Sequence, residues 1–374
     1  MFQHRHDPAT DLPAPHSMFP RLAPTPVAPF VSVIVPVRNE AAFITKTLCQ
    51  LLDQDYDRSR FEVIVADGES TDATTDHVRT LQGRYPNLHL VTNPGRWSSA
   101  GRNVALEVSR GEIVVLVDGH CEVENCRYLS DLVDAFERSG ADCIGRPQPQ
   151  DVSRATPLQR TIAAARASRL GHHPESFIYS SEERFVRPQS VAIAYRREVF
   201  EAVGTFDERF DACEDVEFNH RVDRAGLKCF FTPRVALHYY PRTSLRGLAR
   251  QMVRYGRGRV RLLRKHPETF TPLGFVPALF VLGLLVGPLL ACFSSLLALL
   301  YFGALGLYGV AVTCTSFAIA WRERDWRMLP WAPVVFLAIH AGAGTGILLE
   351  WLKPGKPPTP SKQREPALPR NRAA

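Results

Sequence analysis

The stretch VSVIVPVRNE at residues 31–40 decides the fold, because a mostly β-branched run ends abruptly in polar residues. Such a run predicts a buried strand, and Asn39 is placed to cap a helix reaching about Gln54. The pattern recurs at FEVIVADG (61–68), LHLV (88–91) and EIVVLVDGH (112–120), with shorter strands expected near Cys143 and over 191–195. Strands that alternate with helices at this spacing predict right-handed βαβ units, a mostly parallel central sheet and the α/β fold class.

Polar side chains follow three of these strands where each one ends. They are Arg38 with Glu40, then Asp67, then Asp118 with His120. Ligands of open parallel sheets bind beyond the carboxyl ends of the strands. The sequence therefore predicts a binding site at this edge of the sheet.

The C-terminal third is strongly apolar. The 53 residues 269–321 contain no Asp, Glu, Lys, Arg or His, and about 20 apolar residues suffice to cross a bilayer core. We expect one helix near 273–292 and a second near 297–320, with a turn at Ser294 and Ser295. A charged loop at 321–327 precedes a third apolar stretch, 328–349, in which Gly342, Gly344 and Gly346 suit close helix packing.

Charge near these segments gives two conflicting indications of membrane topology. Arginines before the first span and in the 322–327 loop place both on the cytoplasmic side. Three spans, which we expect, would export the tail, yet six Lys and Arg residues after Leu352 favour the inside. Either the third segment is re-entrant or the tail is exported despite its charge. The predicted location is the inner (plasma) membrane, multi-pass, with the catalytic domain in the cytoplasm. Eight cysteines without a CxxC pair fit that reducing compartment.

Composition divides the chain into five parts. We expect a disordered Pro-rich leader (1–29), a catalytic domain (30–240), a basic interfacial segment (241–268), transmembrane helices (269–352) and a basic disordered tail (353–374). Arg242 to Lys265 holds nine Arg or Lys residues and no acid. This segment predicts a helix lying on anionic headgroups, although some of its arginines could instead grip a diphosphate. Because this charge adjoins the apolar segment, no nucleic-acid partner is expected.

Five local patterns occur in order: VPVRNE (35–40), ADGESTD (66–72), VDGH (117–120), CEDVE (213–217) and QMVRYGRGR (251–259). Together, over about residues 31–265, they resemble the inverting family 2 glycosyltransferases, which have the GT-A nucleotide-sugar-binding fold. The closest resemblance is to the succinoglycan-type glucosyltransferases of exopolysaccharide assembly. Those also have Asp-x-His-Cys where the wider family has Asp-x-Asp.

The resemblance implies a set of donor-binding residues. Pro36, Arg38 and Glu40 would border the base and ribose, and Asp67 would accept a hydrogen bond from the base. Arg102 would reach the nucleotide or donor sugar, with helix packing as the alternative. The remaining donor-site residues come from a Gln-x-x-Arg-Trp-like element in which Tyr replaces Trp, and are Gln251, Arg254 and Tyr255. In that element Arg254 would also assist catalysis by pairing with the departing diphosphate.

The resemblance also implies a divalent metal held by Asp118 and His120. The metal would offset charge on the leaving group. Imidazole is a fair ligand for Mn²⁺, whereas Mg²⁺ prefers oxygen, so Mn²⁺ is favoured. The alternative is that His120 merely caps the turn.

Asp215 is the predicted general base, which would take the acceptor hydroxyl's proton during in-line, inverting attack. Glu214, also assigned to the catalytic set, and Glu217 could raise its pKa by like-charge repulsion. The alternative is an acidic cluster that satisfies a helix dipole.

We therefore expect an enzyme that moves one sugar from a nucleotide donor, UDP-glucose by resemblance, to a hydroxyl of a lipid-linked glycan in surface or extracellular polysaccharide synthesis. Polysaccharide-assembly proteins are further candidate partners. Two other enzymatic readings stay open, transfer to a polyisoprenyl phosphate and processive synthesis. A non-catalytic nucleotide-sugar-binding scaffold is a third alternative.

Overall fold

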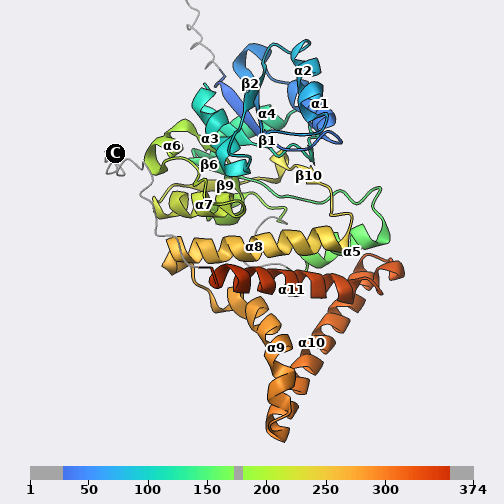
Figure 1. Cartoon of the computed structure of the whole chain (residues 1–374). Coiled ribbons are helices and arrows are strands. Elements are labelled where there is room, and N and C mark those ends of the chain that lie inside the picture. The colour runs from blue at the N-terminus through green and yellow to red at the C-terminus, as the bar shows by residue number, and fades with distance from the viewer. Residues whose placement is uncertain (1–27, 172–179, 354–374) are drawn as a thin grey trace, which may run out of the picture.

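The computed structural model describes residues 28–171 and 180–353. The predicted leader (1–29) and tail (353–374) therefore lie, apart from their inner ends, outside the described residues. Helices and strands alternate through the first two thirds of the chain, and long helices make up the last third (Figure 1).

An eight-stranded sheet forms the centre of the α/β domain, in the order β3-β2-β1-β4-β8-β6-β9-β7. Its first half is parallel, as predicted, and β8 joins β4 antiparallel. The strands of this sheet are β1 (Val31–Val37), β2 (Phe61–Asp67), β3 (Leu88–Thr92), β4 (Ile113–Leu116), β6 (Cys143–Gly145), β7 (Arg184–Val186), β8 (Ala192–Arg196) and β9 (Cys229–Phe231). Two short strands, β5 (Cys121–Glu122) and β10 (His238–Tyr239), pair antiparallel beside it.

Apolar residues cover both faces of the sheet and bury it. Val33 and Val35 of β1 join one core cluster, and Ile34 joins the other, as strand alternation requires. The helices of this domain are α1 (Ile44–Leu52), α2 (Thr74–Gln82), α3 (Ser98–Val108), α4 (Tyr128–Ser139), α6 (Arg197–Val203) and α7 (Glu214–Arg224). A further helix, α5 (Pro157–Ala167), packs instead with the C-terminal helices (Figure 1).

The turn after β1 differs from the prediction. Asn39 does not cap a helix, because it adopts a left-handed φ of 58° and its side chain accepts the backbone N–H of Thr71 instead. α1 begins only at Ile44. The polar turn thus ties the loop after β1 to the loop after β2, which closes this end of the sheet.

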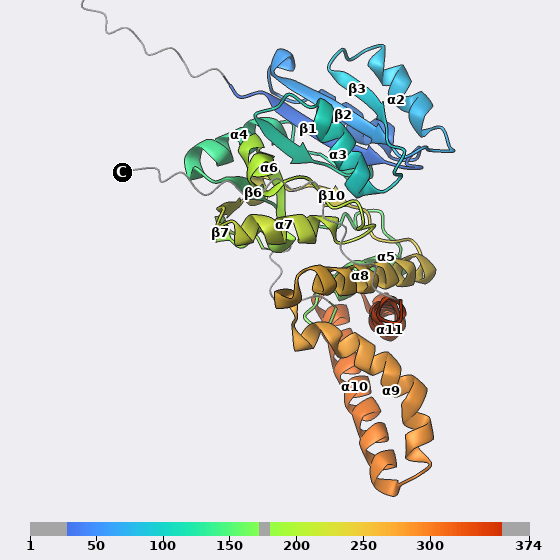
Figure 2. The same ribbon diagram turned by 60° about the vertical axis from the view of Figure 1, so that its left-hand side comes forward.

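Below the α/β domain, α8 (Leu245–Lys265) and α11 (Ala332–Trp351) run horizontally in Figure 1, and α11 is seen nearly end-on beneath α8 in Figure 2. α9 (Val276–Ala291) and α10 (Ser295–Arg322) descend from them as a V-shaped hairpin that turns at Ser294. Among residues 28–171 and 180–353, three helices could cross a membrane by length and composition: Pro272–Ala291, Ser295–Arg322 and Ala332–Trp351. These correspond to the three predicted apolar segments.

Candidate active site

One cavity of about 440 Å³ opens where β1 and β4 end, and residues at the N-terminus of α7 and along α8 also line it. Nearly all of the predicted site residues line it, although they come from five separate segments. They are Pro36, Arg38, Glu40, Arg102, Asp118, His120, Glu214, Asp215, Gln251, Arg254 and Tyr255. A second cavity of about 460 Å³ shares Tyr240 with the first but contains neither Asp118 nor Asp215, so the first is the candidate site.

Asp67 is the predicted site residue that does not line this cavity. It ends β2 with only 6% of its surface exposed, and its Oδ2 accepts the backbone N–H of Ser70 at 3.1 Å. Its Oδ1 has no hydrogen-bond partner among the described residues. An unpaired buried acceptor is costly, so a hydrogen-bond donor next to this oxygen would be stabilising.

Asp118 and His120 stand at the end of β4 with partners that orient them. The Nδ1–H of His120 donates to Glu40 Oε1 at 3.0 Å, since a carboxylate can only accept. This leaves Nε2 for a metal, in the carboxylate–histidine arrangement common around metal ions. Tyr239 donates its hydroxyl to Asp118 Oδ2 at 2.9 Å. One carboxylate oxygen and one imidazole nitrogen thus form a donor set that fits a divalent cation.

The neighbouring charges shift the pKa of both of these groups. Burial raises the pKa of Asp118, but the charges of His120 and Arg102 more than offset this and leave it below its usual range. Burial lowers the pKa of His120, but the hydrogen bond to Glu40 and the charge of Asp118 raise it overall.

Arg102 links the two halves of the cavity. Its guanidinium lies 3.1 Å from Glu214 Oε1 and 4.0 Å from Asp118 Oδ1. The side chain is buried, and its Nε has no hydrogen-bond partner among the described residues. Arg102 therefore contacts both the end of β4, where the candidate metal ligand Asp118 lies, and the N-terminus of α7.

Asp215 occupies the first turn of α7 and faces the cavity. Burial, together with the neighbouring charge of Glu214, raises the pKa of Asp215 to about 6. A carboxylate with such a pKa is suited to accept a proton near neutral pH. Glu217, which was expected to act in the same way, instead pairs with Arg221 and Lys265 on the buried side of the helix.

α8 forms the floor of the cavity. Gln251 donates to the hydroxyl of Tyr255 one turn away, at 3.1 Å. Arg254 donates to the backbone carbonyl of Asp211, in the loop just before α7. The element predicted to bind the diphosphate is thus attached directly to the loop that precedes the predicted base.

Several cavity residues were not anticipated from sequence. Tyr239 is the most consequential, because its hydroxyl also accepts from Arg146 Nη2 at 3.0 Å, and Arg146 is fully buried. The His-Tyr-Tyr run at 238–240 is the signal that could have pointed to it. Other unanticipated lining residues include Arg96, Trp97, Gln148, Gln150, Arg166 and Tyr240.

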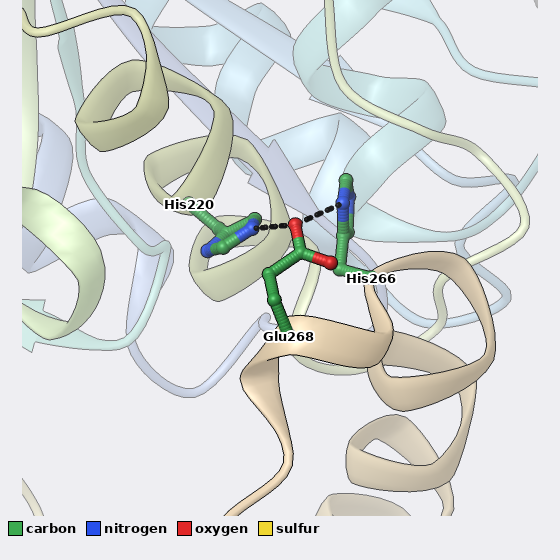
Figure 3. A group of neighbouring side chains, drawn as sticks. All are labelled: His220, His266 and Glu268. Carbon is green, nitrogen blue, oxygen red and sulfur yellow. Dashed lines mark hydrogen bonds and ion pairs between the residues drawn. The ribbon is translucent and has the colours of Figure 1, made fainter.

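A different group, His220, His266 and Glu268, has the spacing of metal ligands (Figure 3). It joins α7 to the segment after α8 and does not line the cavity. Glu268 is already bonded to His220 at 3.0 Å and to Arg224 at 2.7 Å. Since Arg224 already offsets the charge of Glu268, this group acts as an ion-pair link between elements.

Comparison with known proteins places these features in a family. The profile of "Glycosyl transferase family 2" matches residues 32–204, and that of "Glycosyl transferase family group 2" matches residues 125–321. The succinoglycan biosynthesis protein ExoA of Rhizobium meliloti (strain 1021) is 30% identical over 326 residues, 86% of this chain and 94% of that protein.

Two further similarities agree with this relationship. A dolichyl N-acetyl-α-D-glucosaminyl phosphate 3-β-D-2,3-diacetamido-2,3-dideoxy-β-D-glucuronosyltransferase of Methanococcus voltae is 26% identical over 245 residues, 63% of this chain and 74% of that protein. The mannosyltransferase PcManGT from Pyrobaculum calidifontis, solved with GDP-Man and Mn²⁺, superposes with a TM-score of 0.56 at 22% identity. That match covers 87% of this chain and 88% of the other.

The fold and the relatives define a glycosyltransferase with a GT-A-like α/β domain and apolar C-terminal helices. Within that class, the chain belongs to glycosyl transferase family 2 and is related to ExoA and to transferases of lipid-linked glycans.

Proposed function

We propose that the chain transfers a single sugar from a UDP-sugar, UDP-glucose first among them, to a hydroxyl of a lipid-linked glycan, with inversion at the anomeric carbon. The observation that carries this is the span of Arg102, which lies 4.0 Å from Asp118 and 3.1 Å from Glu214, next to Asp215. Metal-type donors and a carboxylate with a raised pKa therefore face one cavity from two elements.

The donor would lie along the strand ends. Pro36, Arg38 and Glu40 would border its base and ribose, and the unpaired Oδ1 of Asp67 would accept a base N–H. Asp118 and His120 would hold Mn²⁺, which when bound neutralises the diphosphate. Arg102 and Arg254 would add positive charge as the diphosphate departs.

Asp215 would act on the acceptor. Its carboxylate would remove the proton from the attacking hydroxyl as that oxygen bonds to the anomeric carbon and the bond to the diphosphate breaks on the opposite face. Glu214 would keep Asp215 basic through its charge, and Tyr255 would shape the acceptor side of the cavity.

Names of the relatives support this acceptor class. One relative is named for succinoglycan biosynthesis, and the other for transferring a sugar to dolichyl N-acetyl-α-D-glucosaminyl phosphate. We propose that this chain likewise acts in surface polysaccharide synthesis, at the inner (plasma) membrane with its catalytic domain in the cytoplasm.

The Asp215→Asn variant tests the function. Removing a general base typically costs about 10²–10⁴-fold in rate. We expect transfer to lipid-linked glycan to fall by that factor while the Kd for UDP stays within about twofold. Retained turnover would exclude the base role and would favour an acceptor that is already ionised, such as a polyisoprenyl phosphate.

The metal assignment has its own test. His120→Asp restores two carboxylates, so it should move the binding preference of the UDP-loaded protein from Mn²⁺ toward Mg²⁺. Titration calorimetry with each metal reads this out independently of turnover. An unchanged preference would indicate that His120 is not a ligand.

A further inference from the structure

The three apolar C-terminal helices differ in what surrounds them. In α9 and α10, only 11% and 6% of the most apolar stretch is buried by other parts of the protein, whereas for α11 the value is 44%. Exposed apolar residues along α9 and α10 require a lipid solvent. Much of α11 is instead covered by protein, chiefly by α8.

Glycines bring α8 and α11 into backbone contact. A Cβ on Gly346 of α11 would lie 2.1 Å from the carbonyl oxygen of Val253, and one on Gly256 of α8 would lie 2.2 Å from that of Ala343. Gly342 approaches Met252 in the same way. Because each helix supplies a glycine to the other, the two cannot separate without losing a closely fitted interface.

α8 cannot lie in the hydrocarbon. The segment from Arg242 to Lys265 carries nine Arg or Lys residues and no acid, and one arginine at a bilayer centre costs about 2.5–3.5 kcal/mol. Arg246 and Arg250, beside the contact with Gly342, are exposed. If α11 spanned the membrane, its middle would carry these arginines, and the α/β domain above them, into the bilayer.

Both ends of α11 also form ion pairs with helices of its own layer, α5 and α8. Before its first turn, Asp325 forms an ion pair with Arg160 of α5 at 3.7 Å. In its last turn, Glu350 accepts from Arg261 of α8 at 2.8 Å. A transmembrane helix would present its two ends to opposite sides of the bilayer.

The end of the described chain is fixed on the same side. Arg264 of α8 donates to the carbonyl oxygens of Glu350, Trp351 and Lys353, at 3.1, 3.1 and 2.9 Å. The chain therefore leaves α11 beside the C-terminal end of α8. Exposed tryptophans near both ends of α11 mark this level as the membrane interface; they are Trp321, Trp326, Trp331 and Trp351.

We propose that, within the described residues, the α9–α10 hairpin is the part that enters the hydrocarbon, and that α8 and α11 lie flat at the membrane surface. Pro272–Ala291 has 20 residues, about 30 Å at 1.5 Å per residue, which matches the core of a bilayer. In Figures 1 and 2, α8 and α11 lie between the α/β domain and the α9–α10 hairpin, which points away from that domain. Residue 353 then lies on the catalytic side, where the positive charge that follows it is favoured.

Cysteine labelling distinguishes this topology from three spans. Cys126 in the α/β domain is exposed, as are Cys292 and Cys314. In a full-length chain with these three changed to serine, one variant restores Cys126 and a second carries Lys353→Cys. A membrane-impermeant maleimide is applied to intact cells, to inverted membrane vesicles and to detergent-solubilised protein, and the chain without an added cysteine gives the blank.

We expect Lys353→Cys and Cys126 to behave alike, with labelling in inverted vesicles and detergent and at least tenfold less in intact cells. Labelling of Lys353→Cys in intact cells while Cys126 stays protected would overturn the proposal and establish a third span. Neither result depends on sugar transfer, so the topology and the proposed activity stand or fall separately.

Discussion

Gly258 of α8 lies against Cys213, so that a Cβ on residue 258 would come within 2.6 Å of the Cys213 sulfur. Cys213 has a left-handed φ of 63°, a conformation that costs a non-glycine residue about 1–3 kcal/mol and persists where neighbours enforce it. It is the residue before α7, two positions from Asp215. The contact from α8 thus supports the strained backbone at Cys213, next to the proposed base Asp215.

This contact predicts an unusual response to Gly258→Ala. Alanine normally stabilises a helix interior by about 1 kcal/mol relative to glycine. Here the methyl group would push Cys213 and Ala212, at an overpacking cost of about 1–3 kcal/mol, and displace Asp215. We expect the initial rate of sugar transfer to fall about tenfold.

A matched control lies in α10, where a Cβ on Gly303 would meet no atom of the described residues within 4 Å. Gly303→Ala should leave the rate unchanged. Parental activity in Gly258→Ala would show that the contact does not position the base.

The pKa of Asp215 predicts the acid limb of the pH profile. Because burial and Glu214 raise this pKa from 3.8 to about 6, the proton-accepting form is lost as the pH falls through 6 rather than through 4. We expect kcat/KM to drop about tenfold per pH unit below 6. Glu214→Gln removes the nearest like charge, so the limb should move to lower pH. An unmoved limb would mean that another group controls it.

Much of the site could be predicted because its residues follow strands. A buried β-branched run fixes where a strand stops, and topology then fixes that Arg38 and Asp118 meet at one edge. Asp67 also follows a strand, but its side chain turns to cap Ser70. Local hydrogen bonding of this kind is invisible to periodicity, as is the left-handed turn at Asn39 that delays α1.

The tertiary partners could not be predicted. Tyr239 lies 121 residues from Asp118 in the chain, and nothing in either local sequence encodes their contact. Apolarity likewise identified the segment of α11 but not its orientation. Hydropathy indicates whether a helix can be placed in a lipid environment. The position of α11 depends also on its packing against α8.

Tyr239→Phe tests the support of Asp118. The change removes the donor to Asp118 and leaves the buried Arg146 without its acceptor at 3.0 Å. Losing a hydrogen bond to a charged group costs about 1.5–3 kcal/mol, so the Kd for Mn²⁺ in the presence of UDP should rise about tenfold or more. The matched control is Tyr240→Phe, since its hydroxyl bonds Glu122 instead. Equal effects in the two variants would refute a specific role for Tyr239.

The ion pairs of Glu217 join the catalytic domain to α8, and their contribution to stability can be measured. It is fully buried on α7 and lies 2.7 Å from Lys265 of α8, 3.0 Å from His266 and 3.0 Å from Arg221. Breaking a buried ion pair by removing one partner costs about 3–5 kcal/mol. In Glu217→Gln, Lys265 keeps its ion pair with Asp207 at 2.7 Å. We therefore expect a loss of stability near the lower end of this range, measured as a lower Tm in detergent.

The difference in Tm between the parent and Glu217→Gln should disappear at acid pH. Burial raises the pKa of Glu217, but His266 and Arg221 more than offset this and bring it from 4.5 to about 2. A carboxylate whose pKa is lower in the folded state stabilises the protein at pH values above its unfolded-state pKa. That stabilisation is lost as the pH falls toward its folded-state pKa. The Tm gap between parent and variant should therefore be full at pH 7 and shrink below about 4.5.

Glu268→Gln is the matched control, because Glu268 joins α7 to the segment just after α8 (Figure 3). Its side chain is 44% exposed, whereas that of Glu217 is buried. Its loss of Tm should be clearly smaller, since water can replace the missing partner. If both variants lost the same amount, burial would not be what makes the Glu217 link strong. If neither did, α7 and α8 would be held together by the Gly258–Cys213 contact and the apolar packing around it.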